Sequence, residues 1–489
     1  MLKVIEIVKK NILVILLLLV TSLTYFRMLK TGMFSTQDFH LFRLYEFDQC
    51  VKNFQIPCRW AADAGLGYGE PLFNFYGQAV YWFGELFYLL GFSFINSIKT
   101  VFVVSLAGSA LSMFYLAKKI WNDNVSAFIS GVLYVFAPYR AVDVWVRGAL
   151  PEAFGFVLLP LILLSIETGS LVWFSVFLSL LILTHNLSVL MFIPIIIVWI
   201  VYRKFWKAFL GGLLSLLLSS FYILPVLFES KFIDIKSTIQ GYFDFHNHFA
   251  TSTELFISNF WGYGASVWGP KDDLSLAVGY VQWLIPLGVL LFLLFKKEVK
   301  KYKQFLILFL LGWFYLFLTH NKSTWVWEAF PLLPYVQFPW RFLGAIVFCF
   351  SLASGLLVIL FNKQKSWLLV LVTLLVVVLN VGFFREDIWY EVDDSYYITG
   401  VEWDRQRTAS IGDFWPNFGH KIPQSPSNGT YINYFPGWIS EQPPVDGLIL
   451  AEGAKFTDTP IRKIGNIISL VALIGLGTFV LKQKWTKRT

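Results

Sequence analysis

Charged residues are scarce in this sequence. Asp, Glu, Lys and Arg make up only 14% of its 489 residues, whereas hydrophobic residues make up 57%. Soluble domains are usually about a quarter charged, so a chain of this composition lacks the polar side chains that a water-facing surface needs. The shortage of charge therefore excludes an ordinary soluble protein and predicts an integral membrane protein.

The sequence also lacks the common signatures of soluble enzymes. It has no Gly-rich phosphate-binding loop, no serine nucleophile elbow, no HExxH motif and no Cys/His set that would complete a zinc site. No repeat of fixed period and no low-complexity tract occurs. The net charge of +8 is carried in short blocks between apolar runs, which is typical of topology signals and argues against nucleic acid as a partner.

Cysteine is rare, with only three residues. Cys50 and Cys58 lie in one predicted outer loop, where they could form a disulfide if that loop faces an oxidising compartment. Two free thiols are an equally good interpretation. Cys349 lies in an apolar run and is expected to behave as a small hydrophobic residue.

Long apolar runs dominate the rest of the sequence. Residues 12–20 and 368–379 are apolar on nearly every side of a helix, as a lipid environment requires. Aromatic residues reach 19%, and Trp and Tyr favour the headgroup region of the lipid bilayer. We therefore expect an all-α polytopic membrane protein with about twelve transmembrane helices. The predicted spans are 11–28, 98–117, 125–139, 153–168, 171–185, 187–202, 208–228, 277–295, 304–319, 342–361, 366–384 and 463–481.

The basic residues give these spans an orientation. With the N-terminus inside, every basic block between spans falls on the inner side, as the excess of Lys and Arg in cytoplasmic loops requires. The blocks are Lys118 and Lys119; Arg203, Lys204 and Lys207; Lys296, Lys297, Lys300, Lys301 and Lys303; Lys363 and Lys365; and Lys482, Lys484, Lys487 and Arg488. No small-residue cleavage site follows the first apolar run, so we expect an uncleaved first span, cytoplasmic termini and a plasma-membrane location.

One apolar segment does not fit as a span. Residues 72–95 are apolar and aromatic, but a crossing there would place Lys118 and Lys119 outside. The segment also contains Asn74, Gln78 and Glu85. We interpret it as interfacial helices lying along the outer leaflet.

The predicted organisation has three parts. Residues 1–384 form a transmembrane body, 385–460 an extracytoplasmic cap, and 461–489 a last transmembrane helix with a basic tail. Short segments of the cap at 431–434 and 448–451 favour a small β element. The longer outer loops are 29–97, 140–152, 229–276 and 385–460, so any reaction is expected at the outer face.

The first outer loop carries a cluster of chemically active side chains. It begins TQDFHLFR, which places Asp38, His40 and Arg43 just past the first span. A carboxylate and an imidazole there could bind a divalent metal such as Mg or Mn, or deprotonate an acceptor hydroxyl. The alternative is a solvated helix start, with Asp38 near an N-cap and Arg43 snorkelling to headgroups.

Further ionisable and polar residues lie against predicted span ends. They are Arg140, Asp143, Arg147, Glu152, His185, Asn186 and Arg341. Charges near membrane depth are costly and usually face a cavity, and a guanidinium can bind phosphate oxygens bidentately. We therefore predict that these residues, apart from Asp143 and together with Arg43, line a site that binds a phosphate-bearing substrate, although snorkelling explains any single Arg equally well.

The third outer loop contains a weaker candidate metal site. Its sequence GYFDFHNHF presents Asp244, His246 and His248. A His-x-His pair with a nearby Asp can bind a metal, but two imidazoles and one carboxylate do not make a specific signal.

Several strings resemble one family of bacterial and archaeal membrane proteins. They are RW…GYGEPLFNFY at 59–76, VRGALPEAFGFVLLPL at 146–161, THNLS at 184–188, NHF…WGYG at 247–264, QFPWRF at 337–342, YFPGW at 434–438 and FTDTPIRKIGNIISL at 456–470. In this order they resemble the proteins labelled "6-pyruvoyl-tetrahydropterin synthase-related". The inward N-terminus, acidic first outer loop and many spans resemble the wider C-type glycosyltransferase superfamily.

This resemblance implies a membrane glycosyltransferase that moves a hexose or pentose from a polyprenyl-phosphate donor to an acceptor. An acidic residue of the first outer loop serves such enzymes as base or metal ligand, which by position is Asp38. The usual pattern has a pair of acidic residues, and here the neighbour is Gln37. Arg147 and Arg341 match the basic residues that bind the donor phosphate. The alternatives are a non-catalytic membrane assembly or binding protein, and a transporter or flippase for lipid-linked saccharides.

Overall fold

The computed structural model describes residues 2–267, 272–408, 412, 414–419 and 421–485, so Lys487 and Arg488 of the predicted basic tail lie outside the described residues. The chain is mostly helical, with 68% helix and 5% strand. Within the described ranges, six helices are long and apolar enough to cross a membrane. They are α6 (Phe94–Trp121), α9 (Leu150–Glu167), α11 (Asn186–Arg203), the run Pro339–Leu360 with α18 (Leu343–Ser354), the run Asn362–Phe383 with α20 (Lys365–Asn380), and α23 (Pro460–Trp485).

Three further candidates are bent helix pairs, which raise the number of spans to nine if each pair crosses once. They are Asn124–Val135 with Pro138–Val146 (bent by 53°), Ala208–Leu218 with Ser220–Phe232 (73°), and Lys303–Thr319 with Asn321–Ala329 (92°). Three shorter apolar helices are Asn11–Ser22 of α1 (Leu2–Ser22), α10 (Leu171–Thr184) and α15 (Tyr280–Phe295). All the predicted spans coincide with one of these helices or pairs, and the count of about twelve crossings stays a prediction.

The first bend has a clear local cause. Helix α7 (Asn124–Val135) ends before Ala137, whose backbone is extended, and Pro138 then opens α8 (Pro138–Ala141). Proline lacks an N–H and disfavours helical geometry in the residue before it. The chain continues into the π-helical segment η2 (Val142–Val146). Residues 138–146 therefore turn by 53° from the axis of α7 instead of continuing it.

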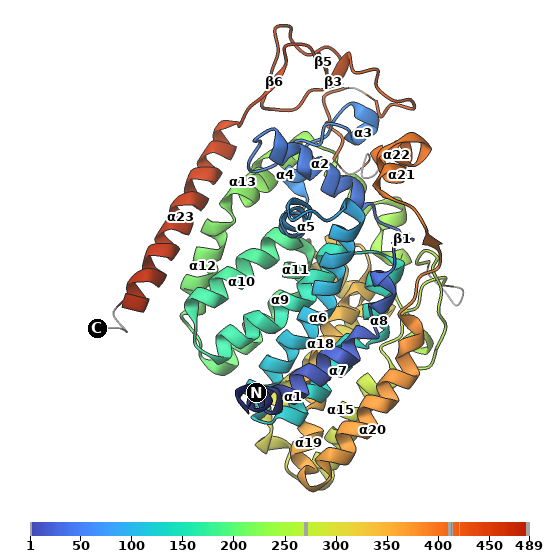
Figure 1. The fold of residues 1–489 in the computed structure, drawn as a ribbon, viewed down its shortest axis with the longest axis vertical. Coiled ribbons are helices and arrows are strands. Elements are labelled where there is room, and N and C mark those ends of the chain that lie inside the picture. The colour runs from blue at the N-terminus through green and yellow to red at the C-terminus, as the bar shows by residue number, and fades with distance from the viewer. Residues whose placement is uncertain (1, 268–271, 409–411, 413, 420, 486–489) are drawn as a thin grey trace.

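The most buried spans form the centre of the bundle. In an apolar window of 18 residues within each span, 83% of the residues are buried in the run Pro339–Leu360, 78% in α9 and 61% in α6. The corresponding shares are only 17% in the run Asn362–Phe383 with α20 and 11% in α23. Figure 1 shows α23 running along one side of the molecule, beside α12 (Ala208–Leu218) and α13 (Ser220–Glu229). Apolar residues cover nearly every side of α20 and α23, so their exposed surfaces suit contact with lipid.

The first loop and the C-terminal cap lie at the same end of the molecule (Figure 1). Strand β1 (Met33–Phe34) of the loop pairs with β2 (Trp389–Tyr390), which enters the cap. The cap contains α21 (Asp394–Ile398), α22 (Gly400–Arg407) and two small antiparallel pairs, β3 (Tyr431–Asn433) with β5 (Leu448–Leu450) and β4 (Trp438–Ile439) with β6 (Lys455–Phe456). The two segments predicted to form a β element are thus paired.

The segment predicted as interfacial contains two short helices, α4 (Leu72–Phe75) and α5 (Ala79–Leu89). The longer one has 11 residues, which corresponds to about 16 Å of helix and is too short to cross a bilayer. Helix α2 (His40–Lys52) packs beside α5 and carries the start of the first loop. These helices lie at the cap end of the bundle (Figure 1).

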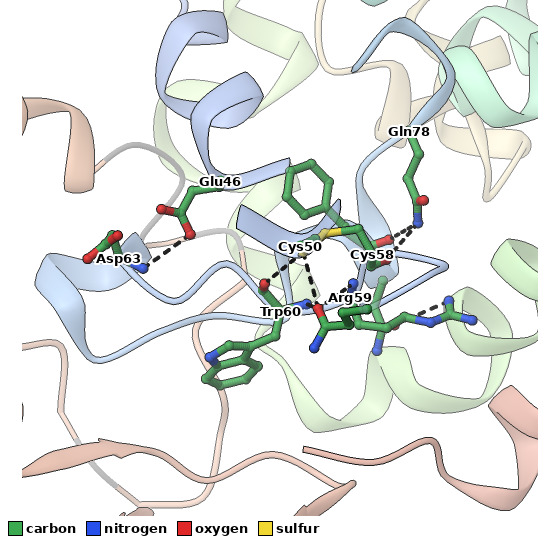
Figure 2. The surroundings of a disulfide bond; sticks show 10 residues. Glu46, Cys50, Cys58, Arg59, Trp60, Asp63 and Gln78 are labelled. Carbon is green, nitrogen blue, oxygen red and sulfur yellow. Dashed lines mark hydrogen bonds between the residues drawn. A yellow bond between two sulfur atoms is a disulfide. The ribbon is translucent and has the colours of Figure 1, made fainter. Parts of the chain in front are cut away.

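A disulfide joins Cys50 and Cys58 (Figure 2). Both sulfur-bearing residues are buried, at 4% and 1% exposure. The Gln78 side chain donates to the Cys58 carbonyl at 3.0 Å and to the Phe73 carbonyl at 2.8 Å, which ties the bridged turn to α4. Of the two interpretations open from the sequence, the structure has the bridged one.

A buried ion pair attaches the last helix to the rest of the protein. The Arg462 guanidinium of α23 donates to the Glu229 carboxylate of α13 at 2.9 Å, and the two side chains are 0% and 3% exposed. Glu229 also accepts from Asn74 at 2.8 Å and from Thr459 at 2.7 Å. Arg59 of the first loop donates to Asn466 of α23 at 2.9 Å. Because α23 is otherwise largely exposed, these bonds fix its N-terminal end.

The disulfide can be tested by thiol labelling. In the protein denatured without reductant, a maleimide should label Cys349 alone, because Cys50 and Cys58 are bridged. After reduction, all three should react. Labelling of Cys50 and Cys58 before reduction, mapped by mass spectrometry, would contradict the bridge.

The buried ion pair predicts a large loss of stability on truncation. Glu229→Ala leaves the fully buried Arg462 without its carboxylate, so we expect a loss of about 3–5 kcal/mol. The control is Glu298→Ala, which removes the exposed partner of Lys301 and should cost about 0–1 kcal/mol. Unfolding of the detergent-solubilised variants provides the measurement, and equal losses in the two variants would refute this account.

Candidate functional site

A cavity of about 540 Å³ lies at the cap end of the bundle. Its wall combines the start of the first loop, the start of α9, the break between α10 and α11, and the segment that leads into α18. Seven of the residues predicted from the sequence line it: Asp38, Arg43, Arg147, Glu152, His185, Asn186 and Arg341. Segments more than 300 residues apart in the chain therefore meet at one site.

Asp38 lies two residues before α2, at the edge of this cavity. The Phe39 N–H donates to its carboxylate at 2.8 Å, and the Arg43 guanidinium donates to the same oxygen. The ring of His40 lies 3.2 Å from the other carboxylate oxygen. Burial alone would raise the pKa of Asp38, but Arg43 and His40 outweigh it and hold that pKa below its usual value. Asp38 is therefore ionised at neutral pH.

His40 lies behind Asp38 and does not line the large cavity. Its side chain is 3% exposed, with Nε2 2.6 Å from the Gly148 carbonyl and Nδ1 2.8 Å from the Tyr81 hydroxyl. The Leu150 N–H also lies 3.2 Å from Nε2, so the ring contacts backbone groups on both sides of the Gly148 turn. This arrangement suits a residue that orients the first loop and contacts Asp38.

Arg147 and Glu152 form the centre of the charged wall. The Arg147 guanidinium donates through Nη1 to Glu152 at 2.9 Å and to Asp143 at 3.0 Å. The turn between them depends on Gly148, whose φ of +64° is open mainly to glycine and whose added Cβ would lie 2.5 Å from Thr36. Tyr139 donates its hydroxyl to the second oxygen of Glu152. The carboxylate is thus fixed from both sides.

Arg341 completes this wall from the opposite segment of the chain. Its Nε lies 3.8 Å from Glu152, and its Nη1 donates to the Val336 carbonyl at 2.9 Å and to Gln337 at 3.0 Å. Arg147 and Arg341 are each 11% exposed, so both reach the cavity while most of each side chain is buried. Two guanidiniums therefore face the cavity together with the Glu152 carboxylate.

Arg140 lies deeper and does not line the cavity. It is 0% exposed and pairs at 3.6 Å with Asp143, which is also 0% exposed. Its guanidinium stacks on Phe156, with the ring centroid 3.8 Å away. Arg140 thus stands behind Arg147 and supports Asp143, the carboxylate that the two arginines share. A headgroup-directed side chain would be exposed, so snorkelling does not describe it.

His185 and Asn186 lie where α10 ends and α11 begins. The His185 Nδ1 is 2.7 Å from the Ser188 hydroxyl, and the Asn186 side chain accepts from the Leu187 N–H at 2.9 Å. Both residues line the cavity. Their place at a helix break keeps polar groups near the site without exposing backbone donors to lipid.

The candidate metal residues are spread over separate contacts. His246 bonds Asp244 at 2.7 Å and lies 3.5 Å from Glu328, whereas His248 bonds the Tyr242 carbonyl and Ser266. Over the described ranges, no three His, Cys, Asp or Glu side chains gather in a way that could hold a metal ion. Both oxygens of Asp38 face cationic or imidazole partners, a donor set that does not fit a divalent cation. Metal dependence stays a prediction.

Sequence reasoning missed the aromatic residues of the site. Arg43 lies 4.4 Å from the ring of Tyr76, and Arg147 lies 4.8 Å from the ring of Trp340. Such stacking stabilises a guanidinium that has lost water. Trp340 stands next to Arg341, and Tyr139 stands next to Arg140. For Trp340 and Tyr139, the available sequence signal was an aromatic residue directly before an arginine at a span end.

The Asp38–Arg43 pair predicts how stability depends on pH. Asp38→Asn should destabilise the protein by about 1–3 kcal/mol at pH 7. Because the folded-state pKa of Asp38 is lowered, its contribution is fully present above the unfolded value of about 4 and is lost as the pH falls through the folded value. The difference in the free energy of unfolding between the wild type and Asp38→Asn should therefore be constant from pH 5 to 8 and shrink below pH 4.

Unfolding at each pH measures this difference. Asp404→Asn removes the mostly exposed partner of Arg407 and is the control, with an expected cost of about 0–1 kcal/mol. A difference for Asp38→Asn that declines already between pH 7 and 5 would contradict the assigned ion pair.

Comparison with known proteins does not extend this picture. No protein-family model and no curated protein matches the sequence.

Proposed function

We propose that this protein is a membrane glycosyltransferase that moves a sugar from a polyprenyl-phosphate donor to an acceptor at the extracytoplasmic face. The observation that carries the proposal is the single cavity that joins an ionised carboxylate, Asp38, to the guanidiniums of Arg147 and Arg341. A carboxylate and a pair of phosphate-binding cations are the groups that this reaction uses.

The charges of the cavity favour a phosphate. Arg147 and Arg341 face it together with one carboxylate, Glu152, which leaves one excess positive charge there. Asp38 is compensated by Arg43. The hydrogen bonds of Arg147 to Glu152 and Asp143 leave from Nη1, so the rest of the guanidinium fork can donate to phosphate oxygens.

The rest of the cavity wall suits a lipid carrier. It includes Leu187 of α11, Val226 of α13, Ile233, Phe243 and Phe414. Two of these residues belong to apolar helices that are candidate parts of the membrane body. A prenyl chain cannot leave the bilayer, so a donor of this kind must reach the site through such a wall.

Each proposed group has a defined role in the reaction. The acceptor hydroxyl gives its proton to the Asp38 carboxylate while its oxygen forms the bond to the anomeric carbon. The bond from that carbon to the phosphate oxygen breaks, and the electron pair leaves with the polyprenyl phosphate. Arg147 and Arg341 neutralise the charge that develops on this phosphate. The acceptor proton becomes strongly acidic as its oxygen bonds to carbon, so a carboxylate of low pKa suffices.

Two features support the outer location of the site. The disulfide of the first loop requires an oxidising compartment. By the positive-inside rule, the side that carries the basic blocks is predicted to face the cytoplasm. The first loop, which carries the disulfide and Asp38, lies at the same end of the molecule as the cap (Figure 1), so one orientation accounts for all three.

Sugar transfer by the purified protein tests the proposal. Undecaprenyl-phosphate-linked glucose, mannose and arabinose serve as donors, and transfer to water is followed as well as transfer to added saccharides. Asp38→Asn should lower the rate of transfer to saccharides at least about 100-fold, because general-base catalysis contributes that much. Arg341→Ala should raise the donor KM, because it removes a phosphate contact.

Arg203→Ala is the matched control for Arg341→Ala, since Arg203 pairs with Glu167 at the other end of α11. It should leave the kinetic constants unchanged. Full activity of Asp38→Asn would remove Asp38 from the mechanism. No transfer or hydrolysis with any donor would favour a non-catalytic binding protein, the alternative that Gln37 in place of a second acid supports.

A further inference from the structure

A second cavity, of about 270 Å³, lies on the other side of Asp38. One part of its wall is the start of the first loop, including Thr36 and His40. The opposite part comes from the cap, with Tyr390 of β2, Tyr396 and Tyr397 of α21, and the polar residues Glu402, Arg405 and Gln406 of α22. None of these cap residues lines the large cavity.

The two cavities share Asp38 and Phe39 in their walls. Phe39 lies under Arg405 of α22, with the guanidinium carbon 4.9 Å from its ring centroid. The Asp38 carboxylate is 26% exposed, which is enough for contact with a ligand. Both cavities therefore meet at the residue proposed as the base, and a molecule in either one can contact it.

The second cavity differs from the first in the direction from which a ligand can enter. Its wall includes Ile98 and Phe102 of the candidate span α6, but its cap side is formed by β2, α21 and α22, which lie outside the candidate spans. On that side Tyr396 and the Arg405 side chain are 41% and 58% exposed. The large cavity borders α11 and α13, which both belong to candidate spans. A ligand of the second cavity thus arrives from the aqueous side, whereas a lipid-borne ligand suits the first.

The side chains of the second cavity suit a molecule with many hydroxyl groups. Glu402 and Arg405 form a bidentate pair at 2.7 and 2.8 Å, and Glu402 also accepts from Gln406 at 3.1 Å. These planar groups present both donors and acceptors, and Tyr390 and Tyr396 stack at 6.3 Å beside them. Aromatic faces with a few fixed polar groups are the usual lining of a pocket for a small polar ligand.

We propose that this second cavity is the acceptor subsite and that it binds a saccharide whose hydroxyl group points at Asp38. The assignment rests on the proposed glycosyltransferase function and adds the class of the acceptor and the residues that select it. The acceptor O–H passes its proton to Asp38 from this side, its oxygen bonds to the anomeric carbon in the large cavity, and the polyprenyl phosphate leaves with the electron pair.

Kinetics of cap variants test the assignment. Tyr396→Ala and Glu402→Gln should each raise the acceptor KM at least about tenfold, because single aromatic and charged contacts dominate small binding sites. The donor KM and the rate of donor hydrolysis by water should not change, because the large cavity is intact. Tyr431→Ala is the matched control, since Tyr431 is an exposed cap residue of β3 outside both cavities.

Direct binding provides a readout that does not need transfer. Maltotriose, cellotriose and chitotriose are the probes, and saturation-transfer NMR of the full-length protein should detect at least one of them. The signal should fall in Tyr396→Ala and persist in Arg341→Ala and Tyr431→Ala. No signal with any trisaccharide, or a signal that Tyr396→Ala leaves unchanged, would overturn the subsite.

The outcomes separate the two proposals. Wild-type transfer with unchanged acceptor KM in both cap variants would reject the acceptor subsite and leave the glycosyltransferase standing. Neither transfer nor hydrolysis of any donor would reject the glycosyltransferase and, with it, the acceptor role. A raised donor KM in the cap variants would show that the cap acts on the large cavity, which also rejects the subsite.

Discussion

The buried ion pair between Arg147 and Glu152 is the interaction on which the site depends. A lone charge at this depth would be very costly, and the cost falls only when opposite charges and hydrogen-bond donors surround it. Tyr139 and Asp143 from the segment 138–147, and Arg341 from the entry into α18, supply those partners. The helix bend before Pro138, the turn at Gly148 and the entry into α18 therefore bring these side chains together. Each charge is then paired within a largely apolar bundle.

Part of this organisation could be read from the sequence. The shortage of charge and the long apolar runs predicted a mostly helical fold, and span ends with Arg, Glu and His predicted polar contacts. Composition could not predict which charged side chains pair with one another. Arg140 and Arg147 look alike in the sequence, yet one is fully buried behind the site and the other reaches the cavity. Their difference arises from the bent and π-helical geometry of 138–147, which no periodic pattern encodes.

The cap shows more clearly that local sequence patterns do not predict tertiary contacts. Its paired strands follow from local patterns, but its approach to Asp38 depends on contacts across the whole chain, such as Met33 with Tyr390 in the β1–β2 pair. His40 lies 3.2 Å from the Asp38 carboxylate, but its contacts with Gly148 and Tyr81 hold it outside the large cavity. Tertiary packing, which overrides local preference, decides which polar residue faces a cavity and which supports its neighbour.

The contact between Arg59, Asn74, Glu229 and the last helix has a consequence for the order of assembly. Arg59 leaves the ribosome early, whereas its partner Asn466 is made about 400 residues later. Until α23 is inserted, Glu229 and Arg59 lack their partners on that helix, so their charges must stay in contact with water or lipid headgroups. This end of the protein can thus close only after α23 has been made, so the first loop cannot reach its mature shape before residues 460–485 are synthesised.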